Sequence, residues 1–410
     1  MSQNIKPAPS RGHSNRSRIA IAGAGIGGLA LALALERRGF RPVVFERKAA
    51  AQIRTEGVFL TLAPNGVNAL RALGLADATI ASGLLTSGLT MFNERGRCLG
   101  TMDYGTHADR FGAPSVTIRR GALGGLLLDA AEKADIELRF ADGIEDVEDE
   151  ADGVVVHAGA SDYFDALVAC DGLRSLVRRK VFPELPQPLY SGLIGTGGLT
   201  WVDGVAPTHG RMHMTFGKRA FFGYLAEPGQ PVMWFNTYPA GEHQTGPITD
   251  PGAYARFVEA MHRDDPLDNA RIMAAVETID RHYPIYDMPE LPHWAKGHIL
   301  LMGDAAHAVA PHSGQGASMA IEDGLVLAAC LEAEDGMHEA FDRFFELRQP
   351  RTQKVIRIGR AAGSQKHAQS WLELRIRDLV LPLVMPMAVK AQEGVFRFRV
   401  DHSPLASPAQ

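Results

Sequence analysis

Cysteine is scarce in this sequence, and no cluster of metal ligands accompanies it. The three cysteines, Cys98, Cys170 and Cys330, are far apart and odd in number, which argues against a disulfide framework and against a zinc site. We therefore expect no bound metal and a reducing, cytoplasmic compartment. Basic residues form no dense block, and the formal net charge is -5. This charge gives no electrostatic reason to expect nucleic acid as a partner.

Long apolar runs are missing as well. No stretch approaches the ~20 apolar residues that are needed to span a bilayer. The nearest is Leu379 to Val389, which is short and contains Pro382 and Pro386. We expect this segment to pack in the core, with attachment to a membrane surface as the alternative, and we expect no stable membrane insertion. Residues 1–17 are polar and lack the apolar centre of a signal peptide, so they are predicted to be a disordered leader.

The residues that are present are those of a soluble globular protein with a sizeable core. Hydrophobic residues make up 46% and charged residues 22% of the 410 residues, which are ordinary proportions for this class. The length allows two domains or one large composite domain. Oligomeric state is not encoded in any pattern that we can identify.

The chain opens, after the leader, with a strand, a turn, a helix and a second strand. The strand Arg18 to Ala22 leads into the glycine turn Gly23 to Gly28, and a strongly helix-forming segment, Leu29 to Arg38, follows. Gly39 ends this helix, and Pro42 to Glu46 is a second buried strand. Such a βαβ unit is typical of a parallel sheet.

The middle of the chain is different. Short strands recur between Glu137 and Ala169 and indicate an antiparallel meander, and the strand-like runs between Leu189 and Tyr238 predict the sheet of a second domain. The chain then returns to a buried strand, His298 to Met302, and to long helices from Gly316 onward. This order predicts an α/β fold in which a Rossmann-like nucleotide domain, formed by the first and last parts of the chain, carries an inserted β-sheet substrate domain and is followed by C-terminal helices.

The predicted boundaries follow from this order. The nucleotide domain is discontinuous, the substrate domain comes from two segments, and the helical segment closes the chain. We predict that the nucleotide domain comprises residues 18–80, 107–183 and 292–360. The substrate domain comprises residues 81–106 and 184–291, and the C-terminal helical segment comprises residues 361–410.

The first motif with chemical meaning is the turn from Gly23 to Gly28, which reads GAGIGG. A dinucleotide pyrophosphate must lie close to backbone N–H groups at a helix N-terminus, where the helix dipole favours negative charge. Side chains would block that approach, so glycines are needed. Glu46, about twenty residues further on, is placed to accept the ribose hydroxyls. A carboxylate there fits the unphosphorylated ribose of FAD or NAD, and the motif does not separate the two.

Two further motifs distinguish an FAD site from an NAD site. Asp171-Gly172 directly follows the last strand of the meander, and Gly303 to His307 (GDAAH) is followed by the loop Pro311 to Gly316 (PHSGQG). Asp304 is placed to hydrogen-bond a sugar-like hydroxyl. The loop and the N-terminus of the next helix can hold the anionic edge of a reduced flavin. We expect His307 to be a structural histidine that fixes the turn.

Together these three segments resemble the group A flavoprotein monooxygenases, which are the hydroxylases similar to p-hydroxybenzoate hydroxylase. That family carries GxGxxG, a DG motif and GDAAH…P..GQG, and the three motifs match here in order and spacing over about residues 18 to 360. The resemblance implies the family's FAD-binding fold, FAD as cofactor, and O2 with NADH or NADPH as co-substrates. It also implies that no separate NAD(P)H domain is present.

The resemblance implies which residues contact FAD. Glu46 would bind the adenosine ribose, and Arg47 would lie near the adenosine or the pyrophosphate. The turn residues at the pyrophosphate would be Gly23, Gly25, Ile26 and Gly28.

The other half of the cofactor has its own expected contacts. Arg120 would lie near the ribityl and phosphate region, and Asp304 would bind the ribityl chain. Asp171 and Gly172 would serve both FAD packing and nicotinamide docking. Gly57 is expected near the cofactor too, although its segment, Glu56 to Phe59, departs from the family's GAGI-like pattern. The residues expected to line the isoalloxazine are Pro311, Gly314, Gln315 and Gly316.

In that family reduced flavin and O2 form a C4a-hydroperoxide, and the protein supplies binding, orientation and water exclusion. The resemblance therefore implies an NAD(P)H-dependent monooxygenase that hydroxylates an apolar, aromatic or polyketide-like small molecule. A base that deprotonates a phenol is a frequent addition. The best polar candidates are His213 and Tyr224, on two strands of the second domain, with an exposed or core position as the alternative for each.

Two other functions stay open at this point. An FAD-dependent reductase or oxidase on the same scaffold would share all three motifs without transferring oxygen. The second is a non-catalytic protein that holds FAD or binds a partner. The presence of the Pro311 to Gly316 motif argues against it, because such a protein would have no need for a loop at the reactive edge of the flavin.

Overall fold

A computed structural model describes residues 17–364, 366 and 370–400 of the chain. The predicted leader lies outside this part of the chain except for Ser17, and so do the last ten residues of the predicted C-terminal segment.

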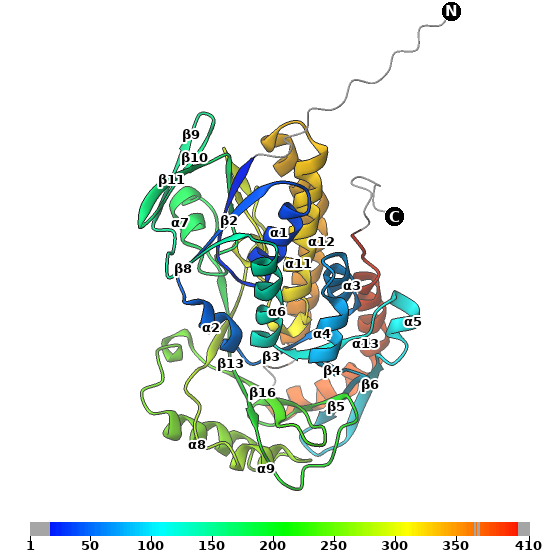
Figure 1. The fold of residues 1–410 in the computed structure, drawn as a ribbon. Coiled ribbons are helices and arrows are strands. Elements are labelled where there is room, and N and C mark those ends of the chain that lie inside the picture. The colour runs from blue at the N-terminus through cyan, green and yellow to red at the C-terminus, as the bar shows by residue number, and fades with distance from the viewer. Residues whose placement is uncertain (1–16, 365, 367–369, 401–410) are drawn as a thin grey trace, which may run out of the picture.

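A mostly parallel sheet of six strands forms the centre of the larger part of the molecule (Figure 1). Its order is β18-β19-β12-β1-β2-β8, and all neighbours run parallel except β18 and β19. In chain order the strands are β1 (Arg18–Ala22), β2 (Arg41–Glu46), β8 (Glu137–Phe140), β12 (Ala166–Ala169), β18 (Ala295–Lys296) and β19 (Ile299–Leu301).

Helices cover one side of this sheet, and α1 (Ile26–Glu36) and α11 (Gly316–Ala333) pack together there (Figure 1). Their backbones approach so closely that a Cβ on Gly324 would lie 2.8 Å from the Leu31 nitrogen. The leucines and alanines of α1 from Leu29 to Leu35 are buried in this contact. Because helix and sheet share one apolar core, the end of β1 and the start of α1 are fixed relative to each other.

The predicted antiparallel meander is only partly correct. Antiparallel pairing is confined to β9 (Asp146–Glu150), β10 (Gly153–Ala158) and β11 (Ala160–Phe164). The flanking strands β8 and β12 join the parallel sheet instead. Every residue of β12 is buried, as expected for a parallel strand that is covered on both faces. Strands β9 to β11 contain both exposed and buried residues, which indicates that one face of their sheet contacts solvent.

A second sheet has seven strands in the order β17-β13-β16-β15-β14-β5-β6. Neighbours are antiparallel except β14 and β5. These strands fall within the two segments predicted for the inserted sheet, whose exact boundaries stay a prediction. They are β5 (Gly88–Asn93), β6 (Cys98–Asp103), β13 (Leu189–Thr200), β14 (Arg211–Phe216), β15 (Phe221–Leu225), β16 (Val232–Pro239) and β17 (Tyr283–Asp287).

The two faces of this second sheet pack against different helices. On one face Phe222 and Trp234 pack with α8 (Pro251–His262) and α9 (Asn269–Ala274). On the other face Phe221 and Leu225 pack with Leu381 of α13 (Trp371–Phe396). Side chains alternate between the faces along each strand, so neighbouring residues such as Phe221 and Phe222 belong to different environments.

The remaining elements connect the two sheets and surround them. A small antiparallel sheet, β3-β7-β4, lies between them. These elements are α2 (Ala50–Thr55), β3 (Phe59–Leu62), α3 (Pro64–Ala72), α4 (Ala76–Ser82), β4 (Leu84–Leu85), α5 (His107–Phe111), β7 (Val116–Arg119), α6 (Arg120–Lys133), α7 (Leu176–Val181), η1 (Glu242–Gln244), α10 (Asp304–His307), η2 (Pro311–Ser313) and α12 (Met337–Ser364).

Helix α13 includes both prolines of the apolar run Leu379 to Val389. The helix continues through Pro382 and Pro386, both of which are exposed. A proline removes the N–H that would bond the carbonyl four residues earlier. At Pro382 that carbonyl belongs to Asp378, and it accepts a hydrogen bond from the Arg97 guanidinium at 3.1 Å instead.

The same helix is longer and more apolar than the sequence led us to expect, since we expected no stretch that could span a bilayer. Among the described residues, Leu372–Phe396 is long and apolar enough to cross a membrane by length and composition. Its inner face, however, is held in the protein, since Arg377 and Asp378 are buried and contact Glu94 and Asn93 of the second sheet region. The predicted core packing is therefore correct for one face of the helix only.

Candidate active site

The three predicted motifs converge at one edge of the parallel sheet. Ala22 of β1 pairs with Ala169 of β12, which pairs in turn with Leu301 of β19. The chain leaves these strand ends into the glycine turn, the Asp171-Gly172 turn and the Gly303-Asp304 turn. Ligands of open α/β sheets bind at the carboxyl ends of their strands, so this edge is where a nucleotide site is expected.

The glycine turn leaves the N-terminus of α1 open. Gly23 has φ +101°, and a Cβ there would lie 2.7 Å from the Cys170 carbonyl oxygen. A Cβ on Gly28 would lie 2.0 Å from the Gly23 oxygen, whereas one on Gly25 would meet no atom within 4 Å. Gly25 and Ile26 line a cavity of about 590 Å³. Gly23 and Gly28 are therefore needed for the turn itself, and Gly25 keeps the approach to the helix end free.

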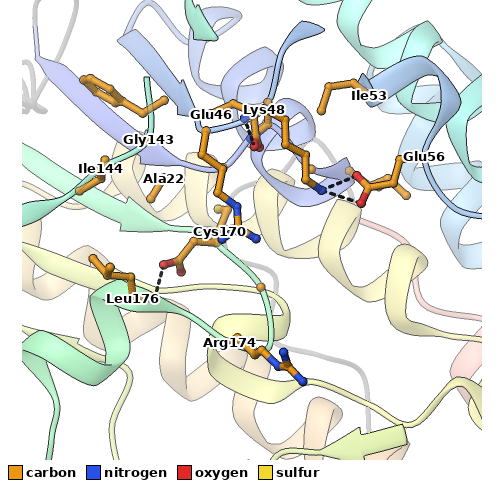
Figure 2. Close-up of a pocket in the computed structure, with 18 of the residues that line it drawn as sticks. Ala22, Glu46, Lys48, Ile53, Glu56, Gly143, Ile144, Cys170, Arg174 and Leu176 are labelled. Carbon is orange, nitrogen blue, oxygen red and sulfur yellow. Dashed lines mark hydrogen bonds and ion pairs between the residues drawn. The ribbon is translucent and has the colours of Figure 1, made fainter. Parts of the chain in front are cut away.

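Charged groups of both signs line this cavity. Figure 2 shows Glu46, Lys48 and Glu56 on one side of it and Cys170, Arg174 and Leu176 on the other. The Glu46 carboxylate accepts hydrogen bonds from the Ala24 N–H at 2.9 Å and the Lys48 N–H at 3.0 Å. It is thus held at the rim of the glycine turn, and its role as a ribose acceptor stays a prediction.

Arg47 lies beside Glu46, and its side chain is exposed along the cavity wall. A Cβ on Gly143 would lie 2.7 Å from the Arg47 Cβ. The glycine therefore allows the loop after β8 to pack against this arginine.

Asp171 has one satisfied and one unsatisfied oxygen. Its Oδ2 accepts hydrogen bonds from the N–H groups of Leu176 at 2.7 Å and Val177 at 3.2 Å. Its Oδ1 is buried and has no partner among the described residues. Burial raises the pKa of this carboxyl, although its hydrogen bonds act in the opposite direction. Neighbouring Gly172 has φ +82°, and a Cβ there would meet no atom within 4 Å, so this turn also faces open space.

Arg120 and Gly57, predicted from separate segments, lie against each other. A Cβ on Gly57, which has φ +78°, would lie 2.6 Å from the Arg120 Cδ. Arg120 Nη1 is 3.7 Å from Glu56 Oε2, and Lys48 Nζ is 2.6 Å from Glu56 Oε1. Burial acts to raise the pKa of Glu56, but the Lys48 hydrogen bond and the Arg120 charge outweigh it and lower that pKa. Lys48 and Glu56 were missed in the sequence, although their position directly after β2 and α2 was a usable signal.

A second cavity of about 460 Å³ adjoins the first, because Lys48 and Glu56 line both. Its other walls come from the free edge of β13 at Gly197 to Thr200 and from the segment between Val276 and Tyr283. The Lys48–Glu56 ion pair thus lies between the two cavities, one at the parallel sheet and one at the second sheet.

The third motif completes the edge of the site. Asp304 is the first residue of α10 and is exposed. The surrounding protein displaces part of its hydration, which raises the pKa of Asp304, and the charges of His307 and Arg120 act in the opposite direction. Pro311 begins η2, and Gly316 is the first residue of α11. Gly314 has φ +62° with no atom within 4 Å of a Cβ position, so this loop borders open space.

Two other residues of this segment point into the core. Gln315 is buried, and its side-chain oxygen accepts a hydrogen bond from Asn65 at 2.9 Å. Only its backbone is therefore available to a ligand. His307 contacts Asp323 with Nε2 to Oδ2 at 2.6 Å, which agrees with the predicted structural role.

His213 and Tyr224 lie on the other face of the second sheet. They are cross-strand neighbours, with His213 Nδ1 3.1 Å from the Tyr224 hydroxyl. Tyr224 packs in the cluster covered by α8 and α9. Burial lowers the pKa of His213 and raises that of Tyr224. The strand pleat places both side chains on the face covered by α8 and α9, so the core position named as their alternative describes them, and a role as a base stays an untested prediction.

The site fits FAD on its own geometry. It offers an open helix N-terminus for a pyrophosphate, a rim carboxylate for a ribose, a cavity of suitable size and an unsatisfied buried acceptor at Asp171. In the part of the chain that the structure describes, no group of three or more His, Cys, Asp or Glu side chains could hold a metal ion.

Comparison with known proteins agrees with this geometry. The family model described as "FAD binding domain" matches residues 16–358. The chain is 32% identical to the aurachin C monooxygenase/isomerase of Stigmatella aurantiaca, over 84% of this chain and 90% of that one. It is 30% identical to the 3-amino-4-hydroxybenzoate 2-monooxygenase of Streptomyces cremeus, over 84% of this chain and 86% of that one.

The fold has also been observed experimentally. The crystal structure of Klebsiella pneumoniae HpxO with FAD and uric acid superposes with a TM-score of 0.81 at 22% identity, covering 93% of this chain and 97% of that one. At this identity the likeness concerns the fold alone.

Proposed function

The chain belongs to the FAD-binding family of flavoprotein monooxygenases, and from this premise we propose that it inserts one oxygen atom of O2 into an aromatic small molecule with NADH or NADPH as the electron donor. The observation that carries this proposal is the convergence of the three motifs on one edge of the parallel sheet. Bound there, FAD would supply the redox and oxygen-transfer chemistry.

The chain's own residues would bind and orient the cofactor. The open N-terminus of α1 at Gly25 would face the pyrophosphate, and Glu46 would accept the ribose hydroxyls. Asp304 and Arg120 would bind the ribityl and phosphate region. The N-terminus of α11 at Gly316 would place its positive end beside the isoalloxazine edge where negative charge develops.

Aromatic side chains support an aromatic substrate. Phe221 and Phe235 lie on the sheet face that is not covered by α8 and α9, and Phe59 of β3 packs edge-on against Phe235 at a centroid distance of 6.2 Å. Phe221 is buried in the cluster beneath α13, whereas Phe59 and Phe235 are only partly buried, so these two rings are the ones that could contact a flat substrate ring. The Streptomyces cremeus relative is named for an aromatic substrate, which supports the same class here.

The nicotinamide nucleotide would use the same site region as FAD. No second glycine turn of the GxGxxG type follows a strand elsewhere in the sequence. Asp171 and Gly172, with the neighbouring Arg174 on the cavity wall, are the proposed docking residues. We propose a cytoplasmic location on the basis of the scarce cysteines.

Turnover in heavy-isotope O2 tests this function. The FAD-loaded protein is incubated with NADH or NADPH and a panel of aromatic compounds, and we expect one heavy oxygen atom in the product together with substrate-stimulated NAD(P)H oxidation. Reduction of the flavin without oxygen in any product would favour the reductase or oxidase instead. Asp304→Ala should purify with most of its flavin lost, whereas Asp109→Ala, which changes an exposed aspartate of α5, should keep it.

A further inference from the structure

Helix α13 carries an apolar stripe that the described part of the chain leaves exposed. The helix lies along the outside of the second sheet, beside β6 (Figure 1). Its inner face is held in the protein by Arg377, Asp378 and Leu381. On its outer face seven large apolar side chains are 40–74% exposed. This apolar stripe consists of Leu372, Ile376, Leu379, Val380, Leu383, Val384 and Met387.

Polar side chains do not interrupt the stripe. Its middle, residues 376–387, contains two charged residues, Arg377 and Asp378, and both are buried. The remaining exposed positions of this range are Pro382 and Pro386. Contiguous apolar patches of this kind are rare on soluble monomers and mark interaction sites.

The spacing of the stripe is that of a helix pair. Steps of four, three and four residues separate Leu372, Ile376, Leu379 and Leu383, as at the a and d positions of a coiled coil. The sequence alone hides this pattern, because buried apolar residues such as Leu381 lie between the exposed ones. Once the structure assigns each residue to a face, the outer row has the form that packs against a second helix.

The stripe is also symmetric about its centre, which lies between Leu379 and Val380. Its two ends, Leu372 and Met387, are equally far from this point. A two-fold axis there would set an antiparallel copy of α13 against the first, and each apolar position would then meet an apolar position. The interface of a symmetric dimer requires such self-complementarity, whereas an unrelated partner does not.

A second copy of the chain fits this surface better than a membrane does. Helices that lie in an anionic membrane surface are rich in Lys and Arg beside their apolar face. The chain has a net charge of -5, and residues 376–387 of α13 expose no basic side chain. Residues 1–16 and 401–410 contain few large apolar residues, so neither segment offers a matching cover.

We propose that α13 is a dimerisation element, and that two copies of the chain associate through their apolar stripes as an antiparallel helix pair. Stable interfaces take about 800 Å² from each partner, and seven large exposed side chains supply an area of that order. The centre of the interface has no charged pair, so we expect a weak dimer with a Kd in the micromolar range. This inference is independent of the proposed function.

Mass measured against concentration tests the dimer. Sedimentation velocity of the FAD-loaded full chain is recorded from about 0.1 to about 100 µM, and we expect a shift from one to two chain masses. Leu383→Glu places a carboxylate in the interface on both copies and should raise the Kd about a hundredfold or more. Leu189→Glu, at an exposed leucine of β13, adds the same charge outside the stripe and should leave the Kd unchanged.

Cysteines at chosen positions test the antiparallel geometry. They are introduced in a Cys98→Ser background, which removes an exposed native thiol. Val380→Cys is next to the two-fold axis and should form a disulfide between chains under mild oxidation. The two copies of Met387→Cys are about 22 Å apart along the helix axis and should not cross-link by themselves. A mixture of Met387→Cys with Leu372→Cys should cross-link, because these positions face each other.

Protein concentration also separates the dimer from the stability of the single chain. Below the dimer Kd, unfolding reports the separate chain, so substitutions in the stripe act only through contacts within that chain. Above the Kd, the apparent stability of the wild type should rise with concentration, and Leu383→Glu should remove this dependence.

Several outcomes would overturn the dimer. A single chain mass at every concentration would do so, and so would a dimer that a folded Leu383→Glu variant leaves intact. If that variant folds poorly, equal cross-linking of Val380→Cys and Met387→Cys would still contradict the antiparallel pair. Binding of a monomeric wild type to vesicles of phosphatidylcholine and phosphatidylserine, with loss of binding in Leu383→Glu, would assign the stripe to a membrane surface instead.

Discussion

Gly25 and Gly28 belong to one turn and meet opposite surroundings. Gly28 is enclosed, because a Cβ would lie 2.0 Å from the backbone oxygen of Gly23. Gly25 is open on the cavity side, with no atom within 4 Å of its Cβ position. One glycine is therefore required by the fold of the turn, and the other by the ligand that approaches it.

Substitution by alanine should separate these two requirements. Gly28→Ala should lower the melting temperature of the protein and its flavin content together, since backbone atoms must move to relieve the contact. Gly25→Ala should fold with an unchanged melting temperature in the flavin-free form and should bind FAD more weakly, by about tenfold or more, because the methyl group enters the path of the pyrophosphate. Fluorescence titration with FAD and thermal unfolding check both, and an unchanged FAD affinity in Gly25→Ala would contradict the assignment.

Residue type and spacing were enough to predict positions, but not side-chain directions. Gly57 and Arg120 could be predicted from family motifs, yet only the structure shows that one packs on the other. Gln315 was predicted in the flavin loop, and its side chain instead bonds Asn65 in the core. For His213 the sequence leaves open which sheet face is covered by helices, and that choice depends on α8, α9 and α13, which lie far away in the chain.

At the scale of an element, α13 has two faces of similar composition and different roles. Leu381 is 9% exposed and packs in the cluster beneath the second sheet, whereas Leu383 is 72% exposed. Apolar periodicity along this segment does not distinguish the two faces, because both are rich in Leu, Val and Met. The two prolines do not break the helix, because both lie on its exposed side, and at Pro382 the Arg97 guanidinium bonds the carbonyl that loses its helical partner.

The pair Leu381 and Leu383 offers a matched test of this packing. Leu381→Ala should destabilise the protein by about 2 kcal/mol or more, as expected for a buried leucine. Leu383→Ala should change stability by less than about 0.5 kcal/mol. Denaturant unfolding of the two variants under identical conditions measures the difference, and equal losses would show that α13 packs with another orientation.

At the scale of the whole molecule, a buried charge network holds the helices behind the site. Arg348 of α12 contacts Asp323 at 2.6 Å and Glu322 at 2.8 Å, both on α11. Arg351 adds two hydrogen bonds to Glu322, and Asn65 of α3 adds another. Burial acts to lower the pKa of Arg348, but the two carboxylates outweigh it and raise that pKa. The network joins α3, α11 and α12, and through His307 it reaches α10.

Removal of the Arg348 side chain should therefore destabilise the folded protein strongly. Arg348→Met leaves Glu322 and Asp323 buried with incomplete compensation, and we expect a loss of about 3–5 kcal/mol in the free energy of unfolding. Arg343→Met on the same helix breaks an ion pair with the exposed Glu346 and should cost less than about 1 kcal/mol. Thermal and denaturant unfolding measure both, and a small loss at Arg348 would mean that the two acids take up protons without consequence for the fold.

The convergence of the three strand ends also sets an order of events during synthesis. The glycine turn after β1 emerges from the ribosome first, yet its partners after β12 and β19 follow only when most of the chain has been made. A truncated chain that stops before Gly303 would keep the expected pyrophosphate and adenosine ribose contacts but would lose Asp304 and the 311–316 loop, so we expect it to hold the cofactor poorly. The yellow colour of a preparation is then a measure of complete translation and correct long-range assembly, read without any assay of catalysis.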